Sequence, residues 1–282
     1  VGTLNANTTG INTGIGQYSL NANTTGTGNT AIGRSSLRLN ISGNDNTAIG
    51  WDALRTNTTG YNNVAVGTAA LYNNTIGIGN TALGFGALIV NTSGNYNISI
   101  GQNALSSNTT GGSNIAIGYI ALNSAITPTQ TIAIGSYSLR NLTTGSGNLA
   151  IGEQALSTTA TGIQHTAVGT FSLLNLGNAT FGNTAIGYSA LRSATSSSYN
   201  TAIGQNALFA STTGSVNVAV GAQSLFTVTT GTGNTAIGGF ALKLATSDNN
   251  TAIGAYSLLN LTTGASNLAV SYTHLTLPTN RE

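Results

Sequence analysis

Side chains able to perform acid–base chemistry are few in this sequence. Its 282 residues include five Asp and Glu, seven Lys and Arg, and two His. Asp45 and Asp52 come from neighbouring repeats and could be read as the pair of carboxylates that hydrolyses a glycosidic bond. They fall at the seventeenth and seventh positions of a 17-residue repeat, however, so we expect them at different corners of the fold. We therefore predict no catalytic residue and no enzymatic activity.

Metal, cofactor and nucleic-acid sites also find little support. His165 stands where the repeat has asparagine, and we interpret it as a substituted ladder residue rather than a general base. The chain has no cysteine, which rules out disulfides and thiolate ligands, and it lacks the aspartates of calcium-binding rolls. A net charge of +2 leaves no electrostatic footprint for nucleic acid. No apolar run is long enough to span a membrane. We predict no cofactor and no metal.

Two sets of side chains recur at fixed positions of the repeat, counted from the asparagine of N-T-A-I-G. Basic residues occupy the tenth position in five units: Arg38, Arg55, Arg140, Arg192 and Lys243. Aromatic residues gather at the sixth and seventh positions, where the candidate contacts are Trp51, Tyr119, Tyr137, Tyr188 and Tyr256. The rings either stack on sugar faces or pack a corner or the seam between subunits.

We expect the tenth position to face water. There its cations either contact anionic surface polymers or form a solvated stripe. Arg140, Arg192 and Lys243 are three turns apart, about 14 Å at the spacing of stacked strands. This separation exceeds a Debye length, so we do not expect these cations to act as one patch.

These positions belong to the unit N-T-A-I-G-x-x-A-L-x-x-N-T-T-G-x-x, which fills nearly the whole chain. Its first position falls at residues 12, 29, 46, 63, 80, 97, 114, 131, 148, 165, 183, 200, 217, 234, 250 and 267. The fifth position is glycine and the ninth is leucine in each of the first fifteen units. One interval is 18 residues and one is 16, and both irregular intervals fall in loop-like stretches. Such a strict repeat predicts that each unit is one turn of a larger coil.

Each unit reads as a strand, a corner, a second short strand and a turn. N-T-A-I-G alternates with period 2, which places the second and fourth positions on one face and the small third and fifth positions on the other. A-L predicts the second strand, and N-T-T-G predicts a turn whose glycine can take a positive φ. A unit this small cannot bury its apolar face alone, so units must stack about 4.8 Å apart with like residues in ladders.

The prediction is an all-β protein, a parallel β-solenoid of about sixteen 17-residue turns in a single domain over residues 1–270. Which small-residue face lines the core and which faces a partner stays open. The repeat is already under way at Val1, so we expect a piece of a longer chain. Residues 271–282 resemble translated sequencing-adapter read-through, and we interpret them as a non-native tail rather than a capping segment.

The repeat resembles the head repeat of YadA-like trimeric autotransporter adhesins. Ala31, Ile32, Gly33 and Ser36 match the A-I-G and following serine of that family's motif, with three extra residues before the turn glycine. The longer unit with N-T-T-G also resembles repeats of phage tail fibres. The resemblance covers about residues 11–270. It implies a left-handed roll, a homotrimer, and an extracellular location on a virion tail or bacterial outer surface. The stalk, neck, anchor or chaperone domain of those proteins is not in this sequence.

The function predicted is that of a structural and adhesive fibre segment, which attaches to a host receptor or surface glycan. Three rivals stay open. An ice-binding solenoid would need unbroken threonine rows, but threonine fills only about half of the second positions. A polysaccharide-degrading tail spike would need paired carboxylates, assembled between subunits. A functional amyloid would grow fibrils.

Overall fold

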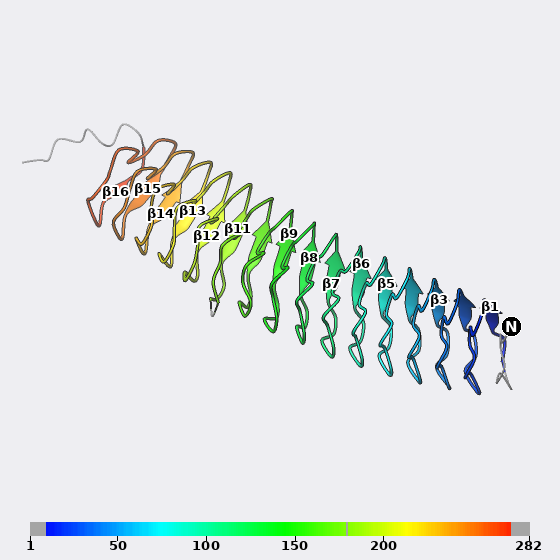
Figure 1. The fold of residues 1–282 in the computed structure, drawn as a ribbon. Coiled ribbons are helices and arrows are strands. Elements are labelled where there is room, and N and C mark those ends of the chain that lie inside the picture. The colour runs from blue at the N-terminus through cyan, green and yellow to red at the C-terminus, as the bar shows by residue number, and fades with distance from the viewer. Residues whose placement is uncertain (1–9, 179, 272–282) are drawn as a thin grey trace, which may run out of the picture. The chain divides into compact units, whose positions relative to one another are not determined.

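The computed structural model describes residues 10–178 and 180–271. The chain divides into two compact units, Val1–Gly147 and Asn148–Glu282. Within each unit the chain coils as a parallel β-solenoid with one strand in every turn (Figure 1). The predicted fold class is confirmed for both units. The prediction of a non-native tail over 271–282 lies, apart from Ser271, outside the described residues.

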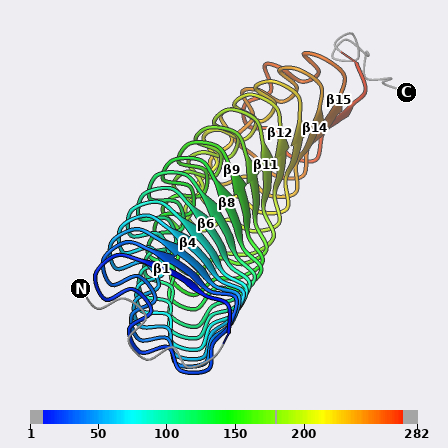
Figure 2. The same ribbon diagram turned by 90° about the vertical axis from the view of Figure 1, so that its right-hand side faces the viewer.

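The two units contain eight strands each, and every strand pairs in parallel with the next one in its unit. The first unit has β1 (Thr13–Ile15), β2 (Thr30–Ile32), β3 (Thr47–Ile49), β4 (Val64–Val66), β5 (Thr81–Leu83), β6 (Ile98–Ile100), β7 (Ile115–Ile117) and β8 (Ile132–Ile134). The second has β9 (Leu149–Ile151), β10 (Thr166–Val168), β11 (Thr184–Ile186), β12 (Thr201–Ile203), β13 (Val218–Val220), β14 (Thr235–Ile237), β15 (Thr251–Ile253) and β16 (Leu268–Ala269). Figure 2 shows the strands of each unit lying side by side along one wall of the coil.

The pairing register follows the repeat even where its length changes. Thr166 pairs with Thr184 across the 18-residue interval, and Thr235 pairs with Thr251 across the 16-residue interval. The extra and the missing residue are therefore absorbed in the loops, as the sequence predicts. Like side chains consequently stack in columns from turn to turn within each unit.

The small face of each strand points into the coil and the aliphatic face points out. Ala48 and Ala202, at the third position, are fully buried, whereas Ile49 and Ile203, at the fourth, are each 37% exposed. Alanine or serine at the eighth position and leucine at the ninth are also buried in the interior. The interior of so short a turn is narrow, so small residues on the strand leave room for the leucine. The structure thus decides which face of the strand is core.

The predicted second strand at A-L is wrong. The ninth-position leucines of the first fifteen turns all have φ between 47° and 54°, which is the left-handed region. Such a conformation costs about 1–2 kcal/mol for a residue with a side chain. It turns each leucine side chain inward, where Leu54 and Leu105 are fully buried, and it lets the Leu54 N–H donate to the carbonyl of Ala70 at 2.9 Å. Burial and this inter-turn hydrogen bond offset the conformational cost.

Two classes of glycine serve different purposes. At the fifth position, Gly33 has φ of 128°, and a Cβ there would lie 2.5 Å from the carbonyl oxygen of Gly50 in the next turn. The N-T-T-G glycines Gly26, Gly60 and Gly111 have no positive φ, in contrast to the role expected from the turn signal; Gly10, with φ of 90°, is the exception. A Cβ at Gly60 would instead lie 2.4 Å from both Asn57 Oδ1 and the carbonyl oxygen of Gly77. Close approach between turns therefore accounts for glycine at this position.

A buried asparagine column joins successive turns at the first position. Asn46 donates its backbone N–H to Asn29 Oδ1 at 3.0 Å, and its Nδ2 donates to the carbonyl oxygen of Gly60 at 2.9 Å. The same bonds recur at Asn63 and Asn200. Each amide satisfies buried backbone groups of two turns, which is what allows a polar side chain inside the coil.

Candidate ligand-contact surfaces

The predicted basic and aromatic residues lie together at the corner that follows each strand. We call this surface the aromatic–basic corner; it comprises the sixth, seventh and tenth positions of the repeat. Every tenth-position cation lies over a ring: Arg38 over Tyr18, Arg55 over Tyr72, Arg140 over Tyr137, Arg192 over Phe171 and Phe209, and Lys243 over Phe226 and Phe240. The cation-to-centroid distances are 5.0–6.0 Å, which suits a cation–π contact worth about 0.5–1 kcal/mol at an exposed site.

The expectation that the tenth position faces water holds fully only for Arg140, which is exposed. Arg38, Arg55, Arg192 and Lys243 are half-buried against their rings. Arg55 is the most constrained of them. It lies 3.7 Å from Asp52, and its guanidinium donates to the hydroxyl of Tyr72 in the next turn. The aromatic–basic corner therefore does not present a stripe of freely solvated cations.

In the second unit these contacts form one continuous column. Arg192 lies between Phe171 and Phe209, at 5.2 and 6.0 Å from the ring centroids. Phe209 stacks on Phe226 at 5.2 Å, and Lys243 lies 5.9 Å from Phe226. Lys243 also lies 5.0 Å from Phe240, which stacks on Tyr256 at 5.1 Å. The rings thus connect Arg192 and Lys243, although their separation by three turns led us to treat them as isolated charges.

The aromatic candidates keep much of their surface exposed despite these contacts. Exposed fractions are 54% for Trp51, 41% for Tyr119, 49% for Tyr188 and 47% for Tyr256. Tyr137 is half-buried and packs edge-to-face against Tyr119 at 5.3 Å. Both roles that the sequence left open are therefore compatible with the corner, since the rings pack on one another and still present an apolar face to solvent.

Some members of the corner were missed by sequence reasoning. Arg34 lies 5.8 Å from the ring of Trp51, yet it occupies the sixth position rather than the tenth. Phe209 and Phe226 occupy the tenth position itself, where only the cations had been counted. A search for any cation or ring at the sixth, seventh and tenth positions together would have found all three.

Among the described residues, Asp45 and Asp52 are not brought together as a pair of carboxylates. Asp45 precedes β3 and Asp52 follows it, so the two lie at opposite ends of one strand, as the repeat positions predicted. Asp52 is engaged by Arg55. Within the described residues, no group of three or more His, Asp or Glu side chains is placed to hold a metal ion.

His165 takes the place of an asparagine in the buried first-position column, as predicted. Its backbone N–H donates to Asn148 Oδ1 at 3.0 Å, and its Nδ1 accepts the backbone N–H of Asn183 at 3.1 Å. Nε2 therefore carries the proton and faces the carbonyl oxygen of Thr180 at 3.1 Å. Desolvation by burial lowers the pKa of His165 to about 4, and the hydrogen bond to the Thr180 carbonyl opposes this shift only in part. The ring is neutral and structural.

The outward sheet face is uncharged and rich in aliphatic residues along both units. We use this name for the second and fourth positions of the strands. Fourth-position or second-position aliphatic residues that are 37–44% exposed include Ile49, Val64, Leu83, Ile98, Ile151, Ile186, Ile203, Ile237 and Ile253. The remaining outward positions of β1–β16 are threonine, valine, isoleucine or leucine, with no charged residue. Exposed aliphatic side chains therefore recur along this face, with threonines between them.

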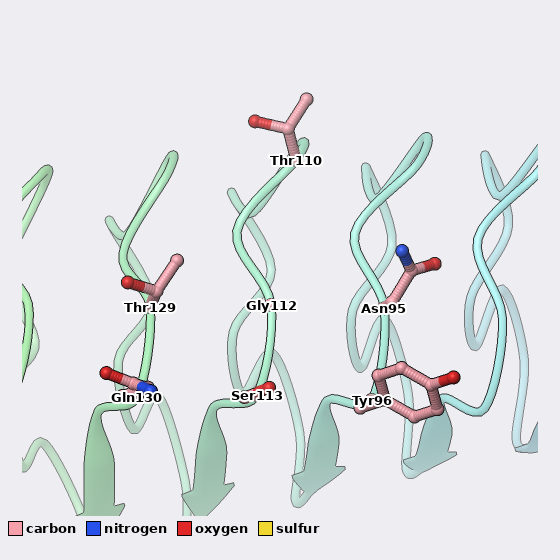
Figure 3. A pocket seen from close by; sticks show the side chains of 7 residues that line it. All are labelled: Asn95, Tyr96, Thr110, Gly112, Ser113, Thr129 and Gln130. Atoms are coloured by element: carbon pink, nitrogen blue, oxygen red, sulfur yellow. The ribbon is translucent and has the colours of Figure 1, made fainter.

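A polar hollow opens in the first unit just before strands β6, β7 and β8. It has a volume of about 410 Å³ and is lined by Asn95, Tyr96, Thr110, Gly112, Ser113, Thr129 and Gln130. Figure 3 shows that these residues come from three consecutive turns, with Gly112 and Ser113 between the other two pairs. No residue of the hollow had been singled out from the sequence, because the gap arises from one glycine in a column of larger residues.

In comparisons with known proteins, no family model and no curated protein matches the chain. The part of the chain that the structure describes contains no helix that could cross a membrane.

Proposed function

We propose that this chain is a non-catalytic attachment segment of a fibre, displayed on a virion tail or bacterial outer surface and assembled as a homotrimer. The observation that carries the proposal is the outward sheet face, where an aliphatic side chain is 37–44% exposed in nine of the sixteen strands. Burial of such a row against other copies would remove apolar surface from water at about 25 cal/mol per Å². A left-handed roll is part of the proposal, because the resemblance to adhesin heads implies it.

Further copies of the same chain are the partners that fit this face best. The row has the period of the solenoid itself, so a second copy in parallel presents the same side chains at the same spacing. In a cyclic trimer all three subunits turn the same side toward the three-fold axis, so one periodic face can serve every copy. A globular partner would have to fit a long, regularly spaced row of isoleucine and threonine side chains. This row carries no charge that could fix the orientation of such a partner.

Attachment would use the aromatic–basic corner of each copy. Exposed rings such as Trp51 and Tyr188 offer apolar faces, and the neighbouring guanidinium groups offer donors to an anionic or hydroxylated surface polymer. Single contacts of this type are weak. Three copies presented on one fibre would raise the overall avidity without any new contact.

The trimer is tested by the absolute mass of the protein in solution, measured by light scattering over a dilution series. We expect three times the chain mass of 28.2 kDa. The double variant Ile186→Lys, Ile203→Lys should dissociate while its circular dichroism spectrum is unchanged, because both side chains are on the outward face. Thr213→Lys, in an exposed turn, is the matched control and should stay trimeric.

A monodisperse wild-type monomer would overturn the proposed assembly. Ice-growth shaping would then be the next measurement, since the threonines of the second position share the outward face with the aliphatic row. If the protein is trimeric, a screen against surface polysaccharides follows. Binding should weaken in Trp51→Ala and Tyr188→Ala.

A further inference from the structure

We infer that one segment of the aromatic–basic corner, in the second unit, binds a sparsely charged acidic polysaccharide laid across successive turns. The segment consists of Arg192, Phe209, Phe226 and Lys243, which we call the Arg192–Lys243 column. The inference rests on the proposed attachment function and deepens it, by naming one part of the corner and one class of ligand.

The four side chains of the column occupy the tenth position of four successive turns, so they stack in this order within the second unit. Arg192 lies 6.0 Å from the ring centroid of Phe209, and Lys243 lies 5.9 Å from that of Phe226. The two rings are 5.2 Å apart, with their planes 11° from parallel. Each ring is thus covered by a cation on one face and by the other ring on the opposite face.

This stacking decides which part of each ring reaches solvent. Phe209 and Phe226 are half-buried, and because their faces are covered, their edges are the parts that remain open. An aromatic ring is negative on its face and positive at its edge. The cations therefore lie over the negative faces, and the positive edges point outward. The open side of the column is positive through all four turns, which favours an anionic ligand and leaves no ring face on which a sugar could stack.

The two cations are not neutralised by the protein. Within residues 10–178 and 180–271, neither Arg192 nor Lys243 forms an ion pair, and neither side chain donates a hydrogen bond to the protein. By contrast, Arg55, at the same repeat position of the first unit, lies 3.7 Å from Asp52 and donates to the hydroxyl of Tyr72. The donors of Arg192 are therefore available to a ligand, and the planar fork of a guanidinium suits a carboxylate or sulfate.

Acidic residues elsewhere in the second unit lie away from the column. Within residues 148–178 and 180–271 they are Glu153 and Asp248. Glu153, at the sixth position of its repeat, is two turns before Arg192, about 10 Å at the spacing of stacked strands. Asp248 precedes β15, whereas the corner follows the strands, and it accepts the backbone N–H of Thr232 at 2.7 Å.

The spacing of the cations selects the class of polyanion. Arg192 and Lys243 are three turns apart, about 14 Å. A nucleic-acid strand carries a phosphate about every 3.4 Å, so most of its phosphates along the column would meet no cation. An anionic membrane is recognised by clusters of about four to eight basic residues. A polysaccharide with neutral sugars between its acidic ones fits two separated cations, and hydroxyl oxygens of the neutral sugars would face the positive ring edges.

The test is calorimetric titration of the full chain with sodium hyaluronate and deacylated gellan, which carry a carboxylate on every second and every fourth sugar. Neutral dextran is the uncharged control. We expect at least one acidic polysaccharide to bind, dextran not to bind, and binding to weaken as the ionic strength is raised. Arg192→Gln should weaken binding at least tenfold and Lys243→Gln at least threefold. Thr213→Asp changes the net charge equally, in an exposed turn of the same unit, and should leave binding unchanged.

Both cations lie at the surface, so the variants should keep the native circular dichroism spectrum. If Arg192→Gln does not, the comparison of Lys243→Gln with Thr213→Asp replaces it. Unchanged binding in the folded variants, equal weakening in Thr213→Asp, or no binding of either acidic polysaccharide overturns the inference. Equally tight binding of poly-L-glutamate or polyadenylate would also overturn it, because charge alone would then account for the contact.

The two proposals fail separately. A monomeric protein that loses hyaluronate or gellan in Arg192→Gln would overturn the trimeric fibre and leave the column as a binding site. A trimer whose polysaccharide binding weakens in Trp51→Ala but not in Arg192→Gln or Lys243→Gln would keep the attachment function and overturn the column as its site.

Discussion

The two units build the same turn with different side chains at the twelfth position. In the first unit this column begins with six buried asparagines: Asn23, Asn40, Asn57, Asn74, Asn91 and Asn108. In the second unit the fully buried members of the column are mostly aliphatic or small: Thr159, Leu176, Ala194, Ser211, Val228 and Ala245. The backbone hydrogen bonds between turns are alike in both units, so the column contributes to stability in two unlike ways without altering the coil.

The asparagine column works as a ladder and needs a partner at every rung. Asn74 Nδ2 donates to Asn57 Oδ1 at 2.8 Å and to the carbonyl oxygen of Gly77 at 3.0 Å. The ladder ends at Asn108, whose Oδ1 is buried without a hydrogen-bond partner among the described residues, because Ala125 follows it in the column. The aliphatic members of the second unit's column have no polar group to leave unpaired, whereas the Oγ of Ser211 in that column is buried without a hydrogen-bond partner among the described residues. The comparison teaches that a buried amide in this column needs an amide in the neighbouring turn as its hydrogen-bond partner, whereas an aliphatic side chain needs no such partner.

The largest effect should come from what the units share, the fifth-position glycine. Gly101 in the first unit and Gly238 in the second have φ of 127° and 133°, and a Cβ at either would lie 2.5–2.6 Å from the carbonyl oxygen of the next turn's glycine. We expect Gly101→Ala and Gly238→Ala each to lower the free energy of unfolding by about 4 kcal/mol or more, from strain and overpacking together. Urea unfolding followed by circular dichroism measures this.

Gly239 provides the control for that comparison. It directly follows Gly238, yet a Cβ there meets nothing within 4 Å. The free energy of unfolding of Gly239→Ala should therefore differ from that of the wild type by no more than about 0.5 kcal/mol. Similar losses in Gly238→Ala and Gly239→Ala would contradict the close approach of successive turns.

An intermediate effect is expected from acid, through the histidine that interrupts the first-position column of the second unit. The pKa of His165 is lowered from 6.5 to about 4, so the unfolded chain takes up a proton before the folded one as the pH falls. Stability is therefore independent of this group above pH 6.5 and falls between pH 6.5 and 4, by about 3 kcal/mol in all, and no further below pH 4.

His165→Asn isolates this contribution. The variant restores the asparagine of the column and has no group that titrates there. Between pH 7 and pH 4, the decrease in its free energy of unfolding should therefore be about 3 kcal/mol smaller than the decrease in the wild type. Urea unfolding at the two pH values measures the difference, and the carboxylates contribute equally to both proteins. Equal losses in the two proteins would show that the ring is not held neutral by burial.

The smallest effect comes from exchanging the twelfth-position residues between the units. Asn74→Val leaves Asn57 Oδ1 without its donor, and Val228→Asn places an amide beside Ser211 and Ala245, neither of which extends a ladder. Each exchange should cost about 2 kcal/mol, the desolvation penalty of a buried polar group that lacks a partner. Melting temperatures and urea midpoints of both variants would measure it. A stabilised Val228→Asn would refute the requirement for a run of amides.

Much of the architecture could be predicted because it depends on spacing. The strand at T-A-I, the parallel pairing and the loops that absorb the 18- and 16-residue intervals all follow from the 17-residue period. The A-L segment could not, because its left-handed leucines contradict the local preference of the residue and are stable only through burial and hydrogen bonds to the next turn. The sequence identified the basic residues and the aromatic residues as two separate sets. It could not show that they contact one another at one corner, because the cation–π contacts join different repeat positions, often of different turns.

By itself, the sequence determined the period, the number of residues in each turn and the columns into which like residues stack, since every turn must satisfy the same backbone bonds. Only the tertiary structure decided which strand face is core, because Ala48 and Ile49 are both apolar and the choice depends on how much room the interior leaves beside Leu54. It also decided that Gly112 leaves a hollow. A missing side chain leaves a hollow only when the turns on either side are in place.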